Sequence, residues 1–140
     1  MGLNIELLQS SFELVKPSAD ELVDRFYDRL FRDYPEVRPL FPEEMGLQKG
    51  HLLASLVFVV ENLRSPERLT TYLQDLGLRH VNYGVEPKHY PAVGRTLLAT
   101  LAEVAGDAWT DELQQAWADA YAAIQSIIFE ALQKSGHAAA

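Results

Sequence analysis

Seven prolines divide this chain into segments in which apolar residues recur every three to four positions, and this pattern constrains the fold more than any other feature. Proline lacks a backbone donor and disfavours helical backbone in the residue before it, so most of these prolines are expected near helix boundaries. No segment alternates apolar and polar residues at a period of two for long enough to predict a strand. The sequence therefore predicts an all-α fold of seven or eight helices.

The expected helices have unequal lengths, which fits an irregular helical sandwich better than an up-down bundle. They cover residues 5–15, 18–34, 45–63, 66–76, 78–83, 87–105 and 110–134, with a short helical turn after Pro35. Ser18 and Glu21 form a capping-box pattern, and Gly77 is expected to permit a turn between two short helices. Residues 1–140 are expected to form one domain, with 136–140 as a flexible tail.

Composition narrows the functional classes. The formal net charge of -8 argues against nucleic acid and against an anionic membrane as partners, because both attract clustered Lys and Arg. No run approaches the roughly 20 apolar residues of a membrane span, and the first ten residues lack the pattern of a secretory signal, so a soluble, cytoplasmic protein is expected. The absence of cysteine excludes thiolate metal sites and covalent haem attachment.

One histidine stands in the most specific sequence context of the chain. His80 lies within LGLRHVNYGV at 76–85, which is followed by HYPAVG at 89–94. Further landmarks occur upstream, namely FYDRLF at 26–31, Pro35, and LF at 40–41. A lone histidine on a helix is ordinarily a surface or core residue, and the surrounding motifs are what favour a ligand here.

These motifs resemble the globin family over nearly the whole chain, and LGLRHVNYGV resembles its proximal histidine region. QDLG at 74–77 and HYP at 89–91 resemble bacterial single-domain globins, which are similar to the globin part of flavohaemoglobins. The resemblance implies a globin fold around a haem b pocket, with His80 as the proximal iron ligand and the opposite iron position free for a gas. It also implies that Phe41 packs flat on the haem.

On the proximal side, the second ring nitrogen of His80 is expected to donate to an acceptor that fixes the ring. Backbone carbonyls and the hydroxyl of Tyr90 are both candidates, since flavohaemoglobins keep a tyrosine at the position of Tyr90. That family also places a glutamate near the end of the last helix, where this chain has Leu132 and where Glu130, two residues earlier, faces elsewhere. The difference weakens the case for peroxidase or nitric oxide dioxygenase specialisation and favours reversible binding.

On the distal side, the resemblance assigns Tyr27 and Gln48 to the gas, with Leu52 one turn further. A bound dioxygen carries partial negative charge, so a phenol and a carboxamide both stabilise it, whereas carbon monoxide gains less. High oxygen affinity is therefore expected. Water, Tyr27, Gln48 or His51 are the alternatives for the sixth iron position at rest.

Further pocket residues follow from the same resemblance. Lys49, Arg79 and His51 are candidates to lie near the haem propionates. An apolar box is expected from Phe26, Leu52, Leu56, Tyr83, Val85, Val93, Leu97 and Phe129, each of which also fits an ordinary core position. Trp117 is expected in the core or at an interface, and His89 and His137 on the surface.

Three functions fit these expectations. The first is reversible binding of dioxygen, with nitric oxide and carbon monoxide as other ligands, for storage, delivery or scavenging. The second is nitric oxide dioxygenation or related haem redox chemistry, which needs a separate reductase because no reductase segment follows residue 140. The third is gas sensing through helix packing. A monomer or a weak homo-oligomer is expected.

Overall fold

The all-α prediction is confirmed in the computed structural model, which describes residues 3–136. It contains α1 (Ile5–Val15), α2 (Ala19–Asp33), α3 (Gly46–Glu61), α4 (Pro66–Asn82), α5 (His89–Ala105) and α6 (Asp111–Lys134). Three short 3-10 helices connect them, η1 (Lys16–Ser18), η2 (Pro35–Leu40) and η3 (Gly106–Ala108). Most of the tail predicted at 136–140, His137 included, lies outside the described residues.

Side-chain caps mark the starts of two helices, α1 and α6. The side chain of Asn4 accepts from Leu7 N at 3.2 Å and caps α1, and Thr110 accepts from Leu113 N at 3.1 Å and caps α6. The capping box predicted at Ser18 is wrong, because no side-chain bond caps α2 there. Since η1 ends at Ser18, the chain already turns helically as it enters α2 and leaves no extended residue for a box.

The predicted break at Gly77 is also wrong, because α4 runs unbroken from Pro66 to Asn82. Gly77 has a different role, since a Cβ atom at this position would lie 2.7 Å from Cγ2 of Ile128. The glycine therefore lets α4 approach α6 closely. Joining two expected helices into α4 is one reason why the described residues form six α-helices instead of seven or eight.

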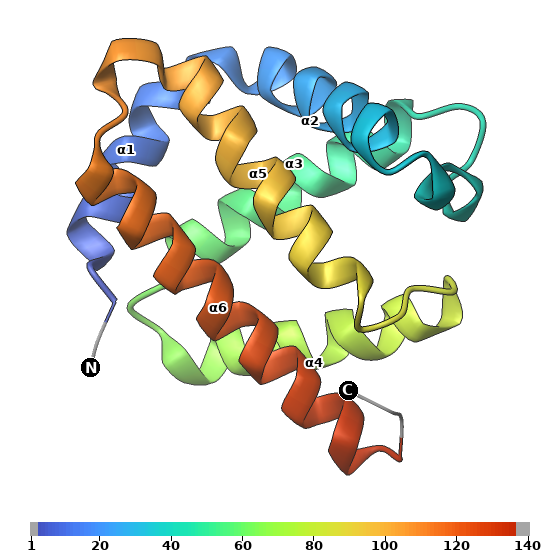
Figure 1. The fold of residues 1–140 in the computed structure, drawn as a ribbon. Helices are drawn as coiled ribbons and strands as arrows, with labels where there is room; N and C mark the ends of the chain where they lie inside the picture. Colours follow the sequence, from blue (N-terminus) through green and yellow to red (C-terminus); the bar gives the residue numbers. More distant parts are fainter. Residues whose placement is uncertain (1–2, 137–140) are drawn as a thin grey trace.

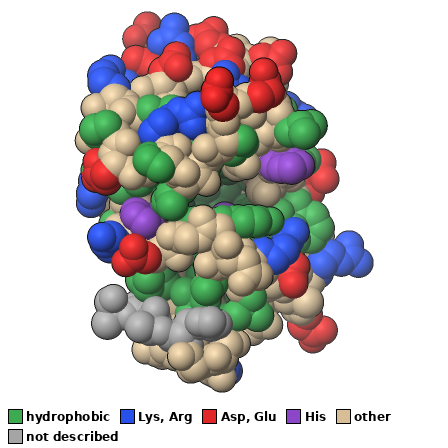
Figure 2. Space-filling view, turned by 90° about the vertical axis from the view of Figure 1, so that its right-hand side faces the viewer, with side chains coloured by type: hydrophobic (Ala, Val, Ile, Leu, Met, Phe, Trp, Pro, Cys, Tyr) green, Lys and Arg blue, Asp and Glu red, His purple; other side chains and the backbone are tan. Residues whose placement is uncertain are grey.

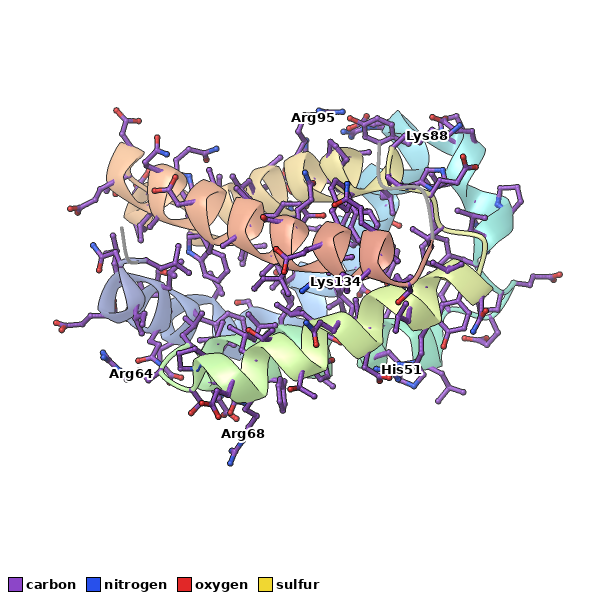
Figure 3. All side chains as sticks on the ribbon, turned by 90° about the horizontal axis from the view of Figure 1, so that it is seen from below. His51, Arg64, Arg68, Lys88, Arg95 and Lys134 are labelled. Carbon is purple, nitrogen blue, oxygen red and sulfur yellow. The ribbon has the colours of Figure 1, made fainter. Side chains whose placement is uncertain are left out.

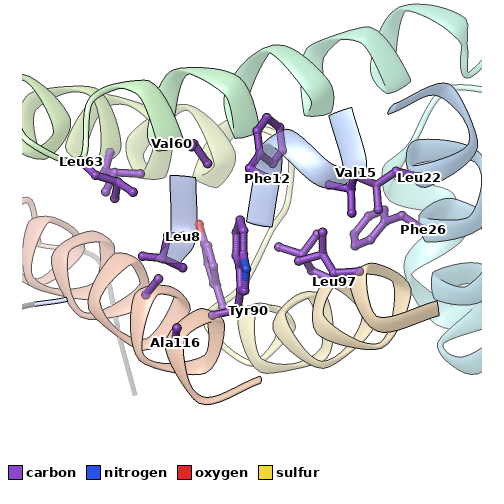
Figure 4. Close-up of a cluster of buried hydrophobic side chains, with 14 of the residues drawn as sticks. Leu8, Phe12, Val15, Leu22, Phe26, Val60, Leu63, Tyr90, Leu97 and Ala116 are labelled. Atoms are coloured by element: carbon purple, nitrogen blue, oxygen red, sulfur yellow. The ribbon is translucent and has the colours of Figure 1, made fainter. Parts of the chain in front are cut away.

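The helices cross in layers around a buried apolar core. Figure 1 shows α5 and α6 crossing the front of the molecule, with α3 behind them and α4 along the lower edge. The main packing partner of α4 is α6, and that of α2 is α5. Figure 4 shows side chains that converge on the centre from several helices, among them Phe12 of α1, Phe26 of α2, Val60 of α3, Leu97 of α5 and Ala116 of α6.

Over residues 3–136, none of the helices is both long enough and apolar enough to cross a membrane.

Candidate functional site

Two consecutive helices frame the candidate site. The chain runs along α3, turns at residues 62–65, and returns along α4 in roughly the opposite direction (Figure 1). Near the turn the two helices touch, because the hydroxyl groups of Ser55 and Tyr72 lie 2.8 Å apart. Gln48 lies two helical turns before Ser55, and His80 lies slightly more than two turns after Tyr72. Gln48 and His80 therefore both lie toward the end of the helix pair that is remote from the turn.

A hydrogen-bonded pair occupies the α2 and α3 side of the site. Nε2 of Gln48 donates to the hydroxyl oxygen of Tyr27 at 3.2 Å. The Tyr27 side chain comes from α2 and is only 3% exposed. Burial raises its pKa, and the bond from Gln48 offsets part of that increase. The phenol is therefore neutral at physiological pH, and its own proton remains available to a third group.

Aromatic rings hold the Tyr27 ring in place. Phe26 packs edge-on against it at 5.0 Å between centroids, and Phe41 does so at 5.5 Å. Phe31 lies 5.7 Å away and itself packs edge-on against Phe41 at 5.3 Å. Such offset and edge-to-face contacts are the favoured arrangements of aromatic pairs. Phe41, predicted to pack against a cofactor, thus belongs to the aromatic group that orients Tyr27.

On the other side, a single backbone contact fixes the tautomer of His80. Its Nδ1 lies 2.7 Å from the carbonyl oxygen of Leu76, one turn earlier in α4. A carbonyl only accepts, so Nδ1 carries the hydrogen. Burial lowers the pKa of His80, the bond to Leu76 opposes this, and the charge of Arg79 lowers it further. The ring is thus neutral near pH 7, and Nε2 carries the lone pair that could bind a metal.

Tyr90 does not bond to this histidine in the structure; of the two acceptors considered for His80, the backbone carbonyl is the one found. The Tyr90 ring is buried and packs edge-on against Phe129 at 5.4 Å. Burial raises the pKa of Tyr90 to about 12. Its backbone carbonyl accepts a 2.6 Å bond from the hydroxyl of Tyr121, which packs on Gly94.

Most residues of the predicted apolar box are buried or partly buried. Leu52, Leu56, Val85, Val93 and Phe129 are partly buried and pack against the core, while Phe26 and Leu97 are buried in it. Tyr83 is an exception at 60% exposed, although its ring lies 5.6 Å from that of His80. In the last helix, Leu132 is buried, and Glu130 faces outward, paired with Lys134 at 3.2 Å.

Two of the three residues predicted to lie near the haem propionates form ion pairs within the protein. Lys49 lies 2.9 Å from Asp24 of α2, and Arg79 lies 3.1 Å from Asp75, one turn earlier in α4. His51 is exposed on α3 and points away from the helix bundle in Figure 3. Their roles near a cofactor stay predictions.

One face of the molecule is hollowed (Figure 2). Figure 2 shows a hollow with hydrophobic side chains in its floor and histidine side chains around it. An apolar floor, one neutral imidazole with an unshared nitrogen, and a buried phenol–carboxamide pair fit a flat apolar cofactor that takes a single nitrogen ligand. Among residues 3–136, no three His, Asp or Glu side chains gather to hold a metal ion by themselves.

The sequence predicted a backbone carbonyl as one possible acceptor for His80 but did not identify which carbonyl, and it gave no sign of a second contact around this site. The carbonyl of Leu76 reaches His80 because both lie four residues apart on one helix, which the predicted break at Gly77 concealed. Helical spacing across Gly77 would have indicated this contact. The bond between Ser55 and Tyr72 joins separate helices, and no local pattern in the sequence indicates it.

Comparison with known proteins places these features in context. The family model described as Globin matches residues 24–128. The flavohemoprotein of Rhizobium meliloti is 36% identical over 132 residues, which cover 87% of this chain and 33% of that protein. The flavohemoprotein of Bacillus subtilis is 31% identical over 86% of this chain and 31% of its own length. The chain thus spans about a third of the length of these relatives.

Solved structures agree with the sequence comparison. A bacterial globin from Campylobacter jejuni superposes with a TM-score of 0.81 at 26% identity, covering 94% of this chain and 96% of the other. An engineered carbene transferase from Rhodothermus marinus, provisionally described as a nitric oxide dioxygenase, superposes with a TM-score of 0.83 at 27% identity. That match covers 94% of this chain and 93% of the other.

Proposed function

This chain belongs to the globin family, and on that premise we propose that it binds haem b through His80 and reversibly holds a diatomic gas, dioxygen first, beside Tyr27 and Gln48. The observation that carries the proposal is the set of polar groups on the two sides of the site, where Tyr27 is buried and Gln48 and His80 are partly buried. Tyr27 and Gln48 form a hydrogen-bonded pair on one side, and His80 presents a neutral ring nitrogen on the other.

Haem, when bound, supplies an iron that takes one imidazole and leaves a position for a gas. His80 is suited to be that imidazole, because the Leu76 carbonyl holds Nδ1 and leaves Nε2 unshared. Phe41, Leu52, Val85 and Val93 would enclose the macrocycle and exclude water from it. Lys49, Arg79 and His51 remain candidates for its propionates.

Tyr27 and Gln48 would determine how long the gas stays. The Tyr27 hydroxyl accepts from Gln48 and still has its own proton to donate, and the Gln48 amide has a second hydrogen. Dioxygen bound beside them carries partial negative charge and gains from both donors. If each bond contributes about 1 to 2 kcal/mol, the two together slow release by roughly ten- to a thousand-fold. This supports high oxygen affinity.

Nitric oxide dioxygenation is the second candidate, and the relatives favour it. The relatives named above are flavohemoproteins about three times the length of this chain, so this activity would require a reductase as electron source. Leu132 argues against it, because a buried leucine stands where the resemblance expects a proximal glutamate. A reductase-supplied protein that removes nitric oxide no faster than an ordinary globin would exclude this candidate.

The decisive experiment measures spectra and release rates. Ferric, ferrous and oxygen-exposed forms are recorded, and oxygen release is then timed for wild type, Tyr27→Phe and Gln48→Leu. Tyr34→Phe is the matched control, because it removes a hydroxyl that accepts from Arg95 at 3.1 Å on the surface. Release at least tenfold faster in both pocket variants and unchanged in the control supports the proposal. Equal release in all four proteins contradicts it, as does failure to take up haem.

A further inference from the structure

Three side chains join α3 to α4 near the turn between them, and we call them the α3–α4 clasp: Ser55, Phe58 and Tyr72. The hydroxyl groups of Ser55 and Tyr72 lie 2.8 Å apart. The rings of Phe58 and Tyr72 stack with centroids 4.2 Å apart and an interplanar angle of 28°. Ser55 and Phe58 are three residues apart, so both face Tyr72 from the same side of α3. Tyr72 is thus held through its ring and its hydroxyl together.

The clasp lies at the closed end of the helix pair. Beyond it, the turn is fixed by Asn62, whose side chain donates to the Phe58 carbonyl at 2.8 Å and whose carbonyl accepts from Ser65 N at 2.9 Å. Figure 3 shows Arg64 and Arg68 near this end of the molecule and His51 near the other end of α3. The site therefore lies on the far side of the clasp from the turn.

The two helices are held by different neighbours away from the clasp. α4 packs mainly on α6, whereas α3 packs on α1 and α2. Between α3 and α4 themselves, the contact of Ser55 with Tyr72 is the one side-chain hydrogen bond within the described residues, while at the turn Arg68 of α4 also donates to Asn62, the residue that caps α3, at 3.5 Å. The Ser55–Tyr72 contact is therefore the one nearer the site.

Because the clasp lies about two helical turns from Gln48 and from His80, a small rotation at the clasp displaces these residues. At 1.5 Å per residue, Gln48 lies about 10 Å from Ser55 along α3, and His80 lies about 12 Å from Tyr72 along α4. A rotation of one helix by about 5° around the clasp would displace its far residue by about 1 Å. Displacements of that size change hydrogen bonds, whose donor and acceptor must lie within a few tenths of an ångström of their preferred separation.

We propose that the α3–α4 clasp is a positioning element that sets the separation of the two helices at the open end, and with it the spacing between His80 and Gln48. The effect on gas release rests on the proposed function, whereas the effect on helix separation does not. Ser55 and Tyr72 are positioning residues, because they act through α3 and α4 and not by touching the gas.

The first arm of the test measures distance. The chain has no cysteine, so Leu47→Cys and Asn82→Cys place two spin labels at exposed positions beside the far ends of α3 and α4. Electron–electron double resonance on the ferrous protein saturated with carbon monoxide gives the label separation, and the same labels report on protein that lacks haem. Tyr72→Phe and Ser55→Ala remove the bond and keep the ring stack, Ser55→Thr keeps the hydroxyl, and Tyr34→Phe is the control.

The second arm measures oxygen release and the iron–histidine stretching frequency for the same variants without labels. Tyr72→Phe and Ser55→Ala should each change the release rate by about threefold or more, the smaller end of what one neutral hydrogen bond contributes. Ser55→Thr should stay near wild type. If a variant only lost stability, its melting temperature would fall while its oxygen release rate and iron–histidine stretching frequency stayed unchanged. This is the result expected for Tyr34→Phe.

The outcomes separate the two proposals. A shifted or broadened label distance with altered release in Tyr72→Phe and Ser55→Ala supports the clasp. An unchanged distance in both variants overturns it, as does a changed distance with wild-type release and stretching frequency. If wild type takes up no haem, the proposed function fails, and the distance arm alone then decides whether the clasp sets the helix separation.

Discussion

Gly77→Ala tests the close approach of α4 to α6 at Ile128. A Cβ atom at position 77 would lie 2.7 Å from Cγ2 of Ile128 and 3.5 Å from its Cβ. Ordinary contact begins near 3.4 Å, so the shortfall is about 0.7 Å. Ile128 is 2% exposed and branched at Cβ, so its side chain has no free rotamer to adopt. The helices must therefore move apart.

The expected magnitude combines two opposing terms. Overpacking a core costs about 1 to 3 kcal/mol, and the rigid, buried partner places this site near the upper end. Replacing glycine by alanine inside a helix contributes about 1 kcal/mol in the opposite direction. The net loss in the free energy of unfolding is then about 2 kcal/mol, or roughly 5 to 10 °C in melting temperature.

Gly50→Ala is the matched control, because Gly50 also lies inside a helix and a Cβ there would meet nothing within 4 Å. It should gain about 1 kcal/mol from helix propensity alone. Urea unfolding and thermal melting of both variants measure the difference, and Gly77→Ala should also alter oxygen release, since Leu76 and His80 lie on the displaced helix. Equal stabilisation by both substitutions would refute the close packing of α4 on α6.

Three further predictions concern single interactions. Trp117→Phe should lower the free energy of unfolding by about 1 to 3 kcal/mol in urea, because it removes a buried 3.0 Å bond from Nε1 to Ser11; an unchanged urea midpoint would contradict this. Burial raises the pKa of Tyr90 to about 12 from 10.0, so its contribution to stability is complete below pH 10.0 and is lost as the pH rises toward 12. Between about pH 8 and about pH 11, the free energy of unfolding should therefore fall less in Tyr90→Phe than in wild type. An equal fall in both proteins would refute the raised pKa of Tyr90. Asp24→Asn should cost less than about 1 kcal/mol, and about 1 M salt should abolish the cost, because the ion pair with Lys49 is exposed to solvent; a larger, salt-independent loss would indicate a further role for Asp24.

Helix positions were largely predictable from the sequence, because apolar periodicity and proline or glycine punctuation are local signals. The helices predicted at 5–15 and 110–134 agree closely with α1 and α6. Gly77 was not predictable, since a glycine in a turn and a glycine under a neighbouring helix look alike in sequence. The distinction depends on Ile128, which is 51 residues away.

The candidate site was predictable to a similar extent. Resemblance assigned Tyr27 and Gln48 to one side of the pocket, and their side chains do meet at 3.2 Å. Periodicity alone cannot bring α2 and α3 together, so the motifs of the family were necessary. The clasp of α3 and α4 lies beyond both kinds of signal, because a serine and a tyrosine on separate helices form no motif.

Replacement of His80 tests the proposal that its imidazole is the iron ligand. His80→Gly removes the imidazole that the Leu76 carbonyl orients, and the ferrous absorption spectrum is recorded with haem, before and after adding free imidazole. The variant is expected to lose the spectrum of a histidine-ligated five-coordinate haem, and added imidazole is expected to restore it. A variant spectrum identical to wild type without imidazole would contradict the assignment of His80 as the iron ligand.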